Sequence, residues 1–139
     1  MINFRGENRG RSWYEHELAA AKAMDVRHVD IRMSASRVPS ARMLAEIRRV
    51  LTDARRPILI HCQGGADRSG LVAALYELWI AGMPARQAGA QLSFYYGHFP
   101  WFGSPTAAMD EAWREVVQGS EAGSHTMGGN ETRRVGRHA

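Results

Sequence analysis

The sequence predicts an α/β fold, one domain with a mostly parallel central sheet flanked by helices. Short apolar segments alternate along the chain with longer segments in which apolar residues recur every three or four positions. This alternation is typical of α/β proteins, whose strands pair in parallel because a helix returns the chain between them. The 139 residues, 45% of them hydrophobic, allow one core and leave too little chain for a second domain of ordinary size.

Three short segments carry the strand patterns. Residues 2–5 and 28–33 alternate apolar with polar side chains, which predicts strands with one buried face. Residues 58–60 read ILI, a continuous apolar run that predicts a strand buried on both faces. These three segments are expected to form the sheet.

The first two helices are placed by their starting residues. Ser12 and Glu15 match the S-x-x-E capping box, so a helix is expected from Ser12 to about Met24. The second helix is expected to begin near Pro39 or Ser40, because the apolar residues that follow recur at helical spacing.

The second half of the chain predicts three more helices. One follows a glycine-containing segment and turns the apolar residues of 71–79 inward. Pro84 suits the first turn of the next helix, which is expected to run to about Tyr96. The last helix is expected near residues 104–118. Residues 119–139, rich in glycine, serine, threonine and arginine, are expected to form a flexible basic tail.

The net charge of +4 raises the question of nucleic-acid binding. Almost all of the basic residues are arginine, and three of them, Arg133, Arg134 and Arg137, lie close to the end of the chain. The excess is thus partly a property of the tail, and a general bias toward arginine does not mark a binding face. Nucleic acid is therefore not an expected partner. No apolar run is long enough to predict a membrane-spanning helix.

The segment PILIHCQGGADRSG, residues 57–70, holds the only cysteine of the chain, Cys62. A strand that leads through a glycine loop into a helix makes an anion site, because loop N–H groups converge where the helix dipole is positive. Arg68 can bind two phosphate oxygens with its planar guanidinium, and the same dipoles should lower the pKa of the Cys62 thiol. The sequence therefore predicts a cysteine nucleophile beneath a phosphate-sized pocket. The alternative, Cys62 as a small core residue, explains neither the arginine nor the glycines.

The pattern of these residues, HC followed after five positions by RSG, resembles the H-C-x5-R-[ST]-G signature of the cysteine-dependent protein tyrosine and dual-specificity phosphatases. The form HCQGGADRSG is similar to the variant of the bacterial branch, and so are the INFRGEN start, the VPS before the second helix and the GHFPWFGSP segment. The resemblance covers about residues 1–118, which are expected to form the domain. It implies a phosphatase-like fold and hydrolysis of phosphomonoesters without a metal or cofactor.

The resemblance also implies roles for the residues of the loop. Cys62 would attack phosphorus and become a phosphocysteine, and Arg68 would bind the phosphoryl group and stabilise the transition state. Ser69 would assist breakdown of the intermediate, and His61 would orient the loop and help to keep the thiol acidic. The phosphate would be bound along the loop, at Gln63, Gly64, Gly65, Ala66, Asp67 and Arg68.

The general acid that must protonate the leaving oxygen is not where the resemblance places it. Family members carry this aspartate on a mobile loop ahead of the cysteine, and the corresponding segment, SASRVPS, has no acidic residue. Asp67, inside the phosphate loop, is the first candidate, with a structural pairing to an arginine as its alternative role. Asp30, in a strand ahead of SASRVPS, is the second. The third possibility is that neither aspartate is the general acid.

An aromatic segment, YYGHFPWFGSP, follows the fourth predicted helix. Its side chains could wall a pocket for an aromatic phosphoester, but packing in the core is the favoured expectation. His98 is expected to be a hydrogen-bonding structural histidine. The single cysteine and the scattered histidines do not match the spacing of a metal site.

The expected partners are phosphorylated proteins carrying phosphotyrosine or dual-specificity sites, with phosphoinositides or small phosphoesters as alternatives. A rhodanese-like sulfurtransferase also places a cysteine in an anion-binding loop, but the spacing to the arginine favours a phosphatase. A phosphate-binding pseudophosphatase is the non-enzymatic alternative.

The start MINFRGENRG lacks the apolar core of a secretory signal, and a reactive thiol suits a reducing compartment, so a cytoplasmic location is expected. Relatives carry a further N-terminal stretch that lines the substrate cleft. Two expectations follow: either the start of this chain is shortened, or that wall of the cleft is absent.

Overall fold

The computed structural model describes residues 1–99, 101 and 103–127. Within them the chain forms a three-stranded sheet in the order β2-β1-β3. Both pairings are parallel, which confirms the predicted α/β class. The strands are β1 (Ile2–Asn3), β2 (Val29–Asp30) and β3 (Ile60–His61).

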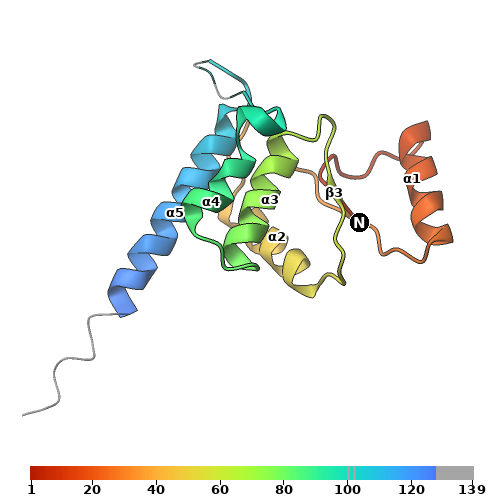
Figure 1. Ribbon diagram of the computed structural model, residues 1–139. Coiled ribbons are helices and arrows are strands. Elements are labelled where there is room, and N and C mark those ends of the chain that lie inside the picture. The colour runs from red at the N-terminus through yellow and green to blue at the C-terminus, as the bar shows by residue number, and fades with distance from the viewer. Residues whose placement is uncertain (100, 102, 128–139) are drawn as a thin grey trace, which may run out of the picture.

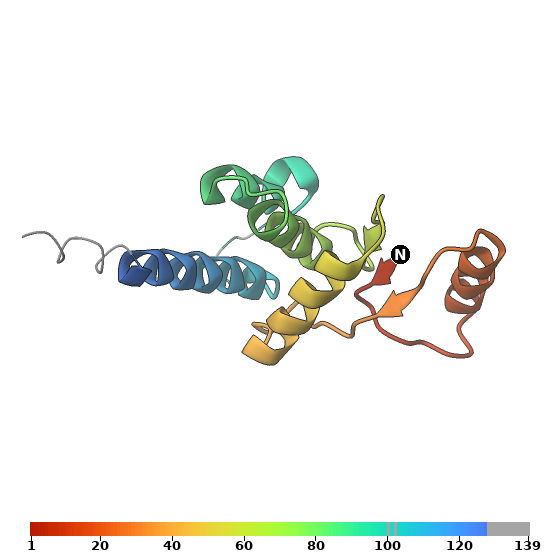
Figure 2. The same cartoon turned by 90° about the horizontal axis from the view of Figure 1, so that it is seen from below.

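The described helices lie on both sides of this sheet. They are α1 (Ser12–Ala23), α2 (Ala41–Asp53), α3 (Asp67–Trp79), α4 (Ala85–Ala88) and α5 (Ala107–Met127), with the 3-10 turns η1 (Gly89–Gln91) and η2 (Phe94–Tyr96). Figures 1 and 2 show α1 apart on one side and the other helices gathered on the opposite side. The central member of that group is α3, which contacts α2, α4, α5 and β3. The helix that follows the loop after Cys62 is therefore held from several directions.

The core lies where the sheet meets α2, α3 and α5. Its buried side chains include Ile2, Phe4, Ile31, Met33, Ile47, Leu51, Leu71, Leu75 and Met109. The inward faces predicted for α2 and α3 are confirmed by this core, except that Leu78 is not part of it. Burial of these side chains removes apolar surface from water, which is the main stabilising contribution to a domain of this size.

The strand that leads to Cys62 differs from its prediction. β3 is an edge of the described sheet, because β1 pairs with it on one side only. Leu59 is 57% exposed, and Ile58 and Ile60 are only partly buried, so the prediction of a strand buried on both faces is wrong. An apolar run is buried on both faces only where other elements cover both, and Leu59 lacks that cover.

The two predicted helix starts have different outcomes. Ser40 is the N-cap of α2, and its hydroxyl accepts a hydrogen bond at 3.2 Å from the N–H three residues later, as predicted. The capping box of Ser12 and Glu15 is wrong, because Arg11 is the N-cap of α1 and its side chain makes no capping bond. Glu15 instead accepts a hydrogen bond at 2.9 Å from the N–H of Gly10, which turns the chain with a φ of +80°.

The helix predicted from Pro84 to Tyr96 is broken into short pieces. Pro84 is the N-cap of α4, but the regular helix lasts only one turn before η1 and η2 replace it. A Cβ atom at Gly89 would lie 2.7 Å from Nε1 of Trp113, so the indole of α5 packs directly on the backbone there. Leu92 then leaves helical geometry, and its side chain is buried in the core. Packing between distant segments therefore decides this conformation, and helical periodicity does not.

The last helix is longer than predicted, because α5 ends at Met127 and not near residue 118. Gly119 and Ser120 lower helix propensity, yet both remain helical, and the Ser120 hydroxyl donates to the Val116 carbonyl one turn earlier. Residues 119–127 of the predicted tail are thus helical, and the remaining tail residues lie outside the described part. None of the helices described is long and apolar enough to cross a membrane.

Candidate active site

The cysteine loop connects β3 to α3, as the sequence predicted. Cys62 follows β3 directly, and α3 begins at Asp67 with Ala66 as its N-cap. Gly65 adopts a φ of +71°, a left-handed conformation in which a side chain is strained. That conformation turns the loop so that its N–H groups can face the space above Cys62.

Hydrogen bonds surround the sulfur of Cys62. The N–H of Gly65 donates to Sγ at 3.3 Å, and Oγ of Ser69 lies 3.4 Å from Sγ. Burial acts to raise the pKa of the Cys62 thiol, but the hydrogen bonds of Ser69 and Gly65 and the charge of Arg68 outweigh it. The net pKa is lowered, so the environment favours the thiolate, which is the nucleophilic form.

Arg68 is fixed beside the loop by two main-chain carbonyls. One of its Nη groups lies 3.2 Å from the carbonyl oxygen of Phe4 and 3.2 Å from that of Met33, and it donates to both. These carbonyls follow β1 and β2, so the guanidinium is anchored at the carboxyl ends of the strands, where open parallel sheets bind ligands. Its Nε is buried and has no hydrogen-bond partner among the residues described. A buried donor without a partner is costly, and the oxygen of a bound anion would satisfy it.

His61 lies behind the loop and is held by an acidic residue of α1. Its Nε2 is 3.0 Å from Oε1 of Glu17, and its Nδ1 is 3.4 Å from the carbonyl oxygen of Cys62. The same oxygen of Glu17 lies 2.7 Å from Nε2 of His28, which precedes β2. Sequence reasoning found neither Glu17 nor His28, because no motif signals a contact between residues so far apart in the chain.

Asp30 does not meet the cysteine loop. It lies in β2, and β1 separates this strand from β3. One carboxylate oxygen accepts a hydrogen bond from the hydroxyl of Tyr14, and the other accepts one at 2.8 Å from the buried amide of Asn3. The bond to Asp30, with burial, raises the pKa of Tyr14 to about 12, so the phenol stays a donor. These contacts tie α1 and β1 to β2 and occupy both oxygens of Asp30.

Asp67 belongs to a different network at the start of α3. Its Oδ1 lies 2.8 Å from Nδ1 of His98, and Nε2 of His98 lies 2.7 Å from Oδ2 of Asp110 in α5. Burial acts to lower the pKa of the fully buried His98, but the hydrogen bonds and charges of the two aspartates outweigh it and raise the pKa. His98 thus makes structural hydrogen bonds, and Asp110 is the partner that sequence reasoning missed.

The aromatic segment lies on the surface, next to the loop. Phe94, which just precedes it, is exposed. Within the segment itself the exposed side chains are Tyr95, Tyr96, Phe99 and Trp101. The favoured expectation that they pack in the core is therefore wrong for these residues, and Phe102 lies outside the described ones. A Cβ atom at Gly97 would lie 3.6 Å from the Cβ of Ala66, which places this exposed segment against the cysteine loop.

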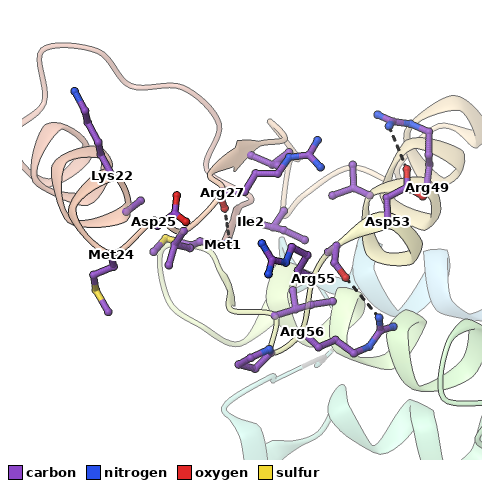
Figure 3. A pocket seen from close by; sticks show the side chains of 17 residues that line it. Met1, Ile2, Lys22, Met24, Asp25, Arg27, Arg49, Asp53, Arg55 and Arg56 are labelled. Carbon is purple, nitrogen blue, oxygen red and sulfur yellow. Dashed lines mark hydrogen bonds and ion pairs between the residues drawn. The ribbon is translucent and has the colours of Figure 1, made fainter.

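A separate cavity of about 740 Å³ opens at the other end of the strands. It is lined by Met1, Val29 and Ile58 near the strand starts, and by basic side chains of α1, α2 and the loops beside them. Figure 3 shows Lys22, Arg27, Arg49, Arg55 and Arg56 around it. No residue of the cysteine loop lines this cavity, so it is no part of the thiol site.

The structure brings most of the predicted site residues together and leaves one apart. Cys62 at the start of the loop meets Arg68 and Ser69 from the first turn of α3. Asp67 lies beside them and His61 behind, whereas Asp30 lies across the sheet. Among the described residues, no three acidic, histidine or cysteine side chains are grouped to hold a metal ion.

Comparison with known protein families matches residues 1–99 to the DSP-PTPase phosphatase that is fused to NAD+ kinase. The matched range includes the sheet, the cysteine loop, α3 and His98, and it confirms the resemblance seen in the sequence. A comparison with curated proteins found no match. The chain therefore belongs to the family of DSP-PTPase phosphatases that the HCQGGADRSG loop indicated.

Proposed function

We propose that the chain hydrolyses phosphomonoesters through a phosphocysteine at Cys62. In the first step the thiolate forms a bond to phosphorus, the bond to the ester oxygen breaks, and an acid protonates that leaving oxygen. In the second step water attacks phosphorus, the phosphorus–sulfur bond breaks, and inorganic phosphate leaves with the thiolate restored. The observation that carries this proposal is the buried Nε of Arg68, which finds no hydrogen-bond partner in the described part of the chain, beside a thiol whose pKa is lowered.

The remaining loop residues fit supporting roles in this reaction. The loop from Gln63 to Arg68 would bind the phosphate oxygens, and the start of α3 adds a positive dipole there. Ser69, 3.4 Å from Sγ, would stabilise the thiolate as it leaves phosphorus. His61 would orient the loop through the carbonyl of Cys62, itself fixed by Glu17.

Asp67 is the proposed general acid. It lies at the loop that would bind the phosphate, its carboxylate is partly exposed, and only its Oδ1 is hydrogen-bonded within the described chain. Both carboxylate oxygens of Asp30, the other candidate, accept hydrogen bonds from the structural residues Asn3 and Tyr14. This contrast favours Asp67, because a general acid needs a free oxygen near the leaving group.

Phosphotyrosine or dual-specificity protein sites are the proposed substrates. The exposed rings of Phe94, Tyr95 and Phe99 lie on a segment that contacts the phosphate loop at Gly97. Aromatic rings stack on one another, so such a surface suits a phenyl phosphoester. Phosphoinositides and small phosphoesters share the phosphate chemistry and are the alternatives that a substrate panel would separate.

The test is hydrolysis of 4-nitrophenyl phosphate by the wild type and by Cys62→Ser, with chelator present. The expected result is turnover that persists with chelator and is lost in the variant. A wild type without turnover, whose Cys62 is nevertheless protected from alkylation by phosphate, would indicate a phosphate-binding pseudophosphatase. Cyanide-dependent consumption of thiosulfate would indicate a sulfurtransferase instead.

A further inference from the structure

The row Asp67, His98 and Asp110 links the phosphate loop to α5 through a buried imidazole. Each ring nitrogen of His98 faces a carboxylate oxygen, at 2.8 Å on the side of Asp67 and 2.7 Å on the side of Asp110. A neutral imidazole carries one N–H and could donate only one of these bonds, whereas an imidazolium donates both. The geometry therefore fits a protonated His98.

The charges around the ring agree with this protonation state. Burial acts to lower the pKa of His98, but Asp67 from α3 and Asp110 from α5, both as carboxylates, raise it. When Asp67 carries its proton, the charge of Asp110 remains to favour the imidazolium. The imidazolium and the Asp110 carboxylate cancel in charge. Asp67 therefore receives a strong hydrogen bond from a pair that is neutral as a whole.

We propose that His98 and Asp110 are positioning residues for Asp67, which occupy its Oδ1 so that the transferred proton is held at Oδ2. This inference rests on the proposed function, in which Asp67 is the acid. An oxygen that accepts a bond from an imidazolium is a poor place for a further proton, so the proton is left on the other oxygen. Within the described chain Oδ2 makes no hydrogen bond, and the Asp67 side chain is 30% exposed.

Every proton in the two steps is accounted for without a change in the protonation of His98. In the first step Asp67 gives the proton on Oδ2 to the leaving oxygen and becomes a carboxylate. In the second step the same oxygen takes a proton from the attacking water. His98 keeps both of its ring protons throughout, which is why it is a positioning residue and not a proton donor in the reaction.

The role of Asp110 follows from its charge. In Asp110→Asn the amide oxygen can still accept a hydrogen bond from Nε2, but the negative charge that helps to raise the pKa of His98 is gone. His98 then loses a proton at lower pH than in the wild type. The neutral ring can present a lone pair at Nδ1, which draws the proton of Asp67 to Oδ1, away from the leaving group.

The experiment compares two substrates in wild type, Asp67→Asn, Asp110→Asn and His98→Asn. Phenyl phosphate has a poor leaving group and depends on the acid, whereas 4-nitrophenyl phosphate depends on it much less. General acid catalysis contributes about 100- to 10,000-fold, so we expect Asp110→Asn to lose at least about tenfold on phenyl phosphate and far less on the nitrophenyl ester. The loss should grow as the pH rises. His98→Asn keeps a donor for Oδ1 but not the charge that makes this oxygen a poor place for a proton. It should therefore also lose activity selectively on phenyl phosphate, but by less than Asp110→Asn.

The matched control is Glu111→Gln, which removes a carboxylate charge from the exposed neighbouring position of α5. We expect wild-type rates on both substrates. A direct readout is the nitrogen NMR signal of the His98 ring, identified by its loss in His98→Asn, which should show both ring protons in the wild type and titrate at lower pH in Asp110→Asn.

Three outcomes would overturn the inference, and they differ from one another. Equal slowing of both substrates by Asp110→Asn, with selective slowing by Asp67→Asn, would leave the proposed function standing and assign His98 and Asp110 a purely structural role. Equal slowing by Asp67→Asn would remove Asp67 as the acid and the inference with it. Wild-type turnover that does not require Cys62 would reject the proposed function itself.

Discussion

The hydroxyl of Ser69 is expected to control the reactivity of Cys62. It lies 3.4 Å from Sγ, and its hydrogen bond lowers the pKa of the thiol. Ser69→Ala removes that bond and leaves the Gly65 N–H and the Arg68 charge in place. The pKa of Cys62 should therefore rise, and the thiolate fraction at a given pH below it should fall.

The size of the effect follows from the type of bond. A hydrogen bond to a charged group contributes about 1.5–3 kcal/mol, and the long S···O separation places this one near the lower value. Since 1.36 kcal/mol corresponds to a factor of about ten, alkylation of Cys62 by iodoacetamide should slow about tenfold at mildly acidic pH. The difference should vanish at high pH, where the thiol is ionised in both proteins.

The assay needs a control for general effects of removing a serine. Ser120→Ala removes an exposed hydroxyl from α5 that donates to the Val116 carbonyl of the same helix, and alkylation should stay at the wild-type rate. An alkylation rate in Ser69→Ala equal to that of the wild type across the acidic range would show that this hydroxyl does not stabilise the thiolate.

Two further predictions concern stability and are measured by chemical denaturation. Leu75→Ala should lower the free energy of unfolding by about 2–5 kcal/mol, because Leu75 is fully buried in α3, whereas Leu59→Ala should change it by less than about 0.5 kcal/mol. Similar losses at both positions would contradict the described core. Gly65→Ala should cost about 1–2 kcal/mol, because its φ is +71°, and Gly64→Ala, without a positive φ, should cost much less. Equal costs would refute the loop geometry.

The cysteine loop could be predicted because its chemistry is local in the sequence. Cys62, Ser69 and Arg68 lie within eight positions of one another, so one strand, one loop and one helix turn bring them together. The direction of the Cys62 pKa shift followed from the same loop. The class of the fold could be read from the alternating segments for a similar reason.

Contacts between distant segments could not be predicted in this way. Glu17 reaches His61 across 44 positions, and Asp67 joins His98 across 31. No local pattern distinguishes these side chains from solvated ones, so their pairing depends on how α1 and α5 pack. The identity of the best acid candidate depended on that packing.

Packing also decided the elements that were placed wrongly. Periodicity predicted one helix from Pro84, but the chain forms short helical turns there instead. The break comes where the Trp113 ring packs on the backbone of Gly89. The ILI run predicted a strand buried on both faces, yet Leu59 is exposed and Ile58 and Ile60 are only partly buried. In the first case a neighbour far away along the chain overrides the local propensity, and in the second the neighbouring elements do not cover Leu59.

The central claim is that phosphate is carried on the sulfur of Cys62, and rapid quenching followed by mass spectrometry tests it most directly. Wild-type protein is mixed with 4-nitrophenyl phosphate, quenched in acid within the first turnover, and digested. The account predicts a phosphate on the peptide that contains Cys62, absent in Cys62→Ala, which should also lose turnover. Turnover that continues in Cys62→Ala, or a wild-type burst of nitrophenol with no phosphate on Cys62, would contradict it.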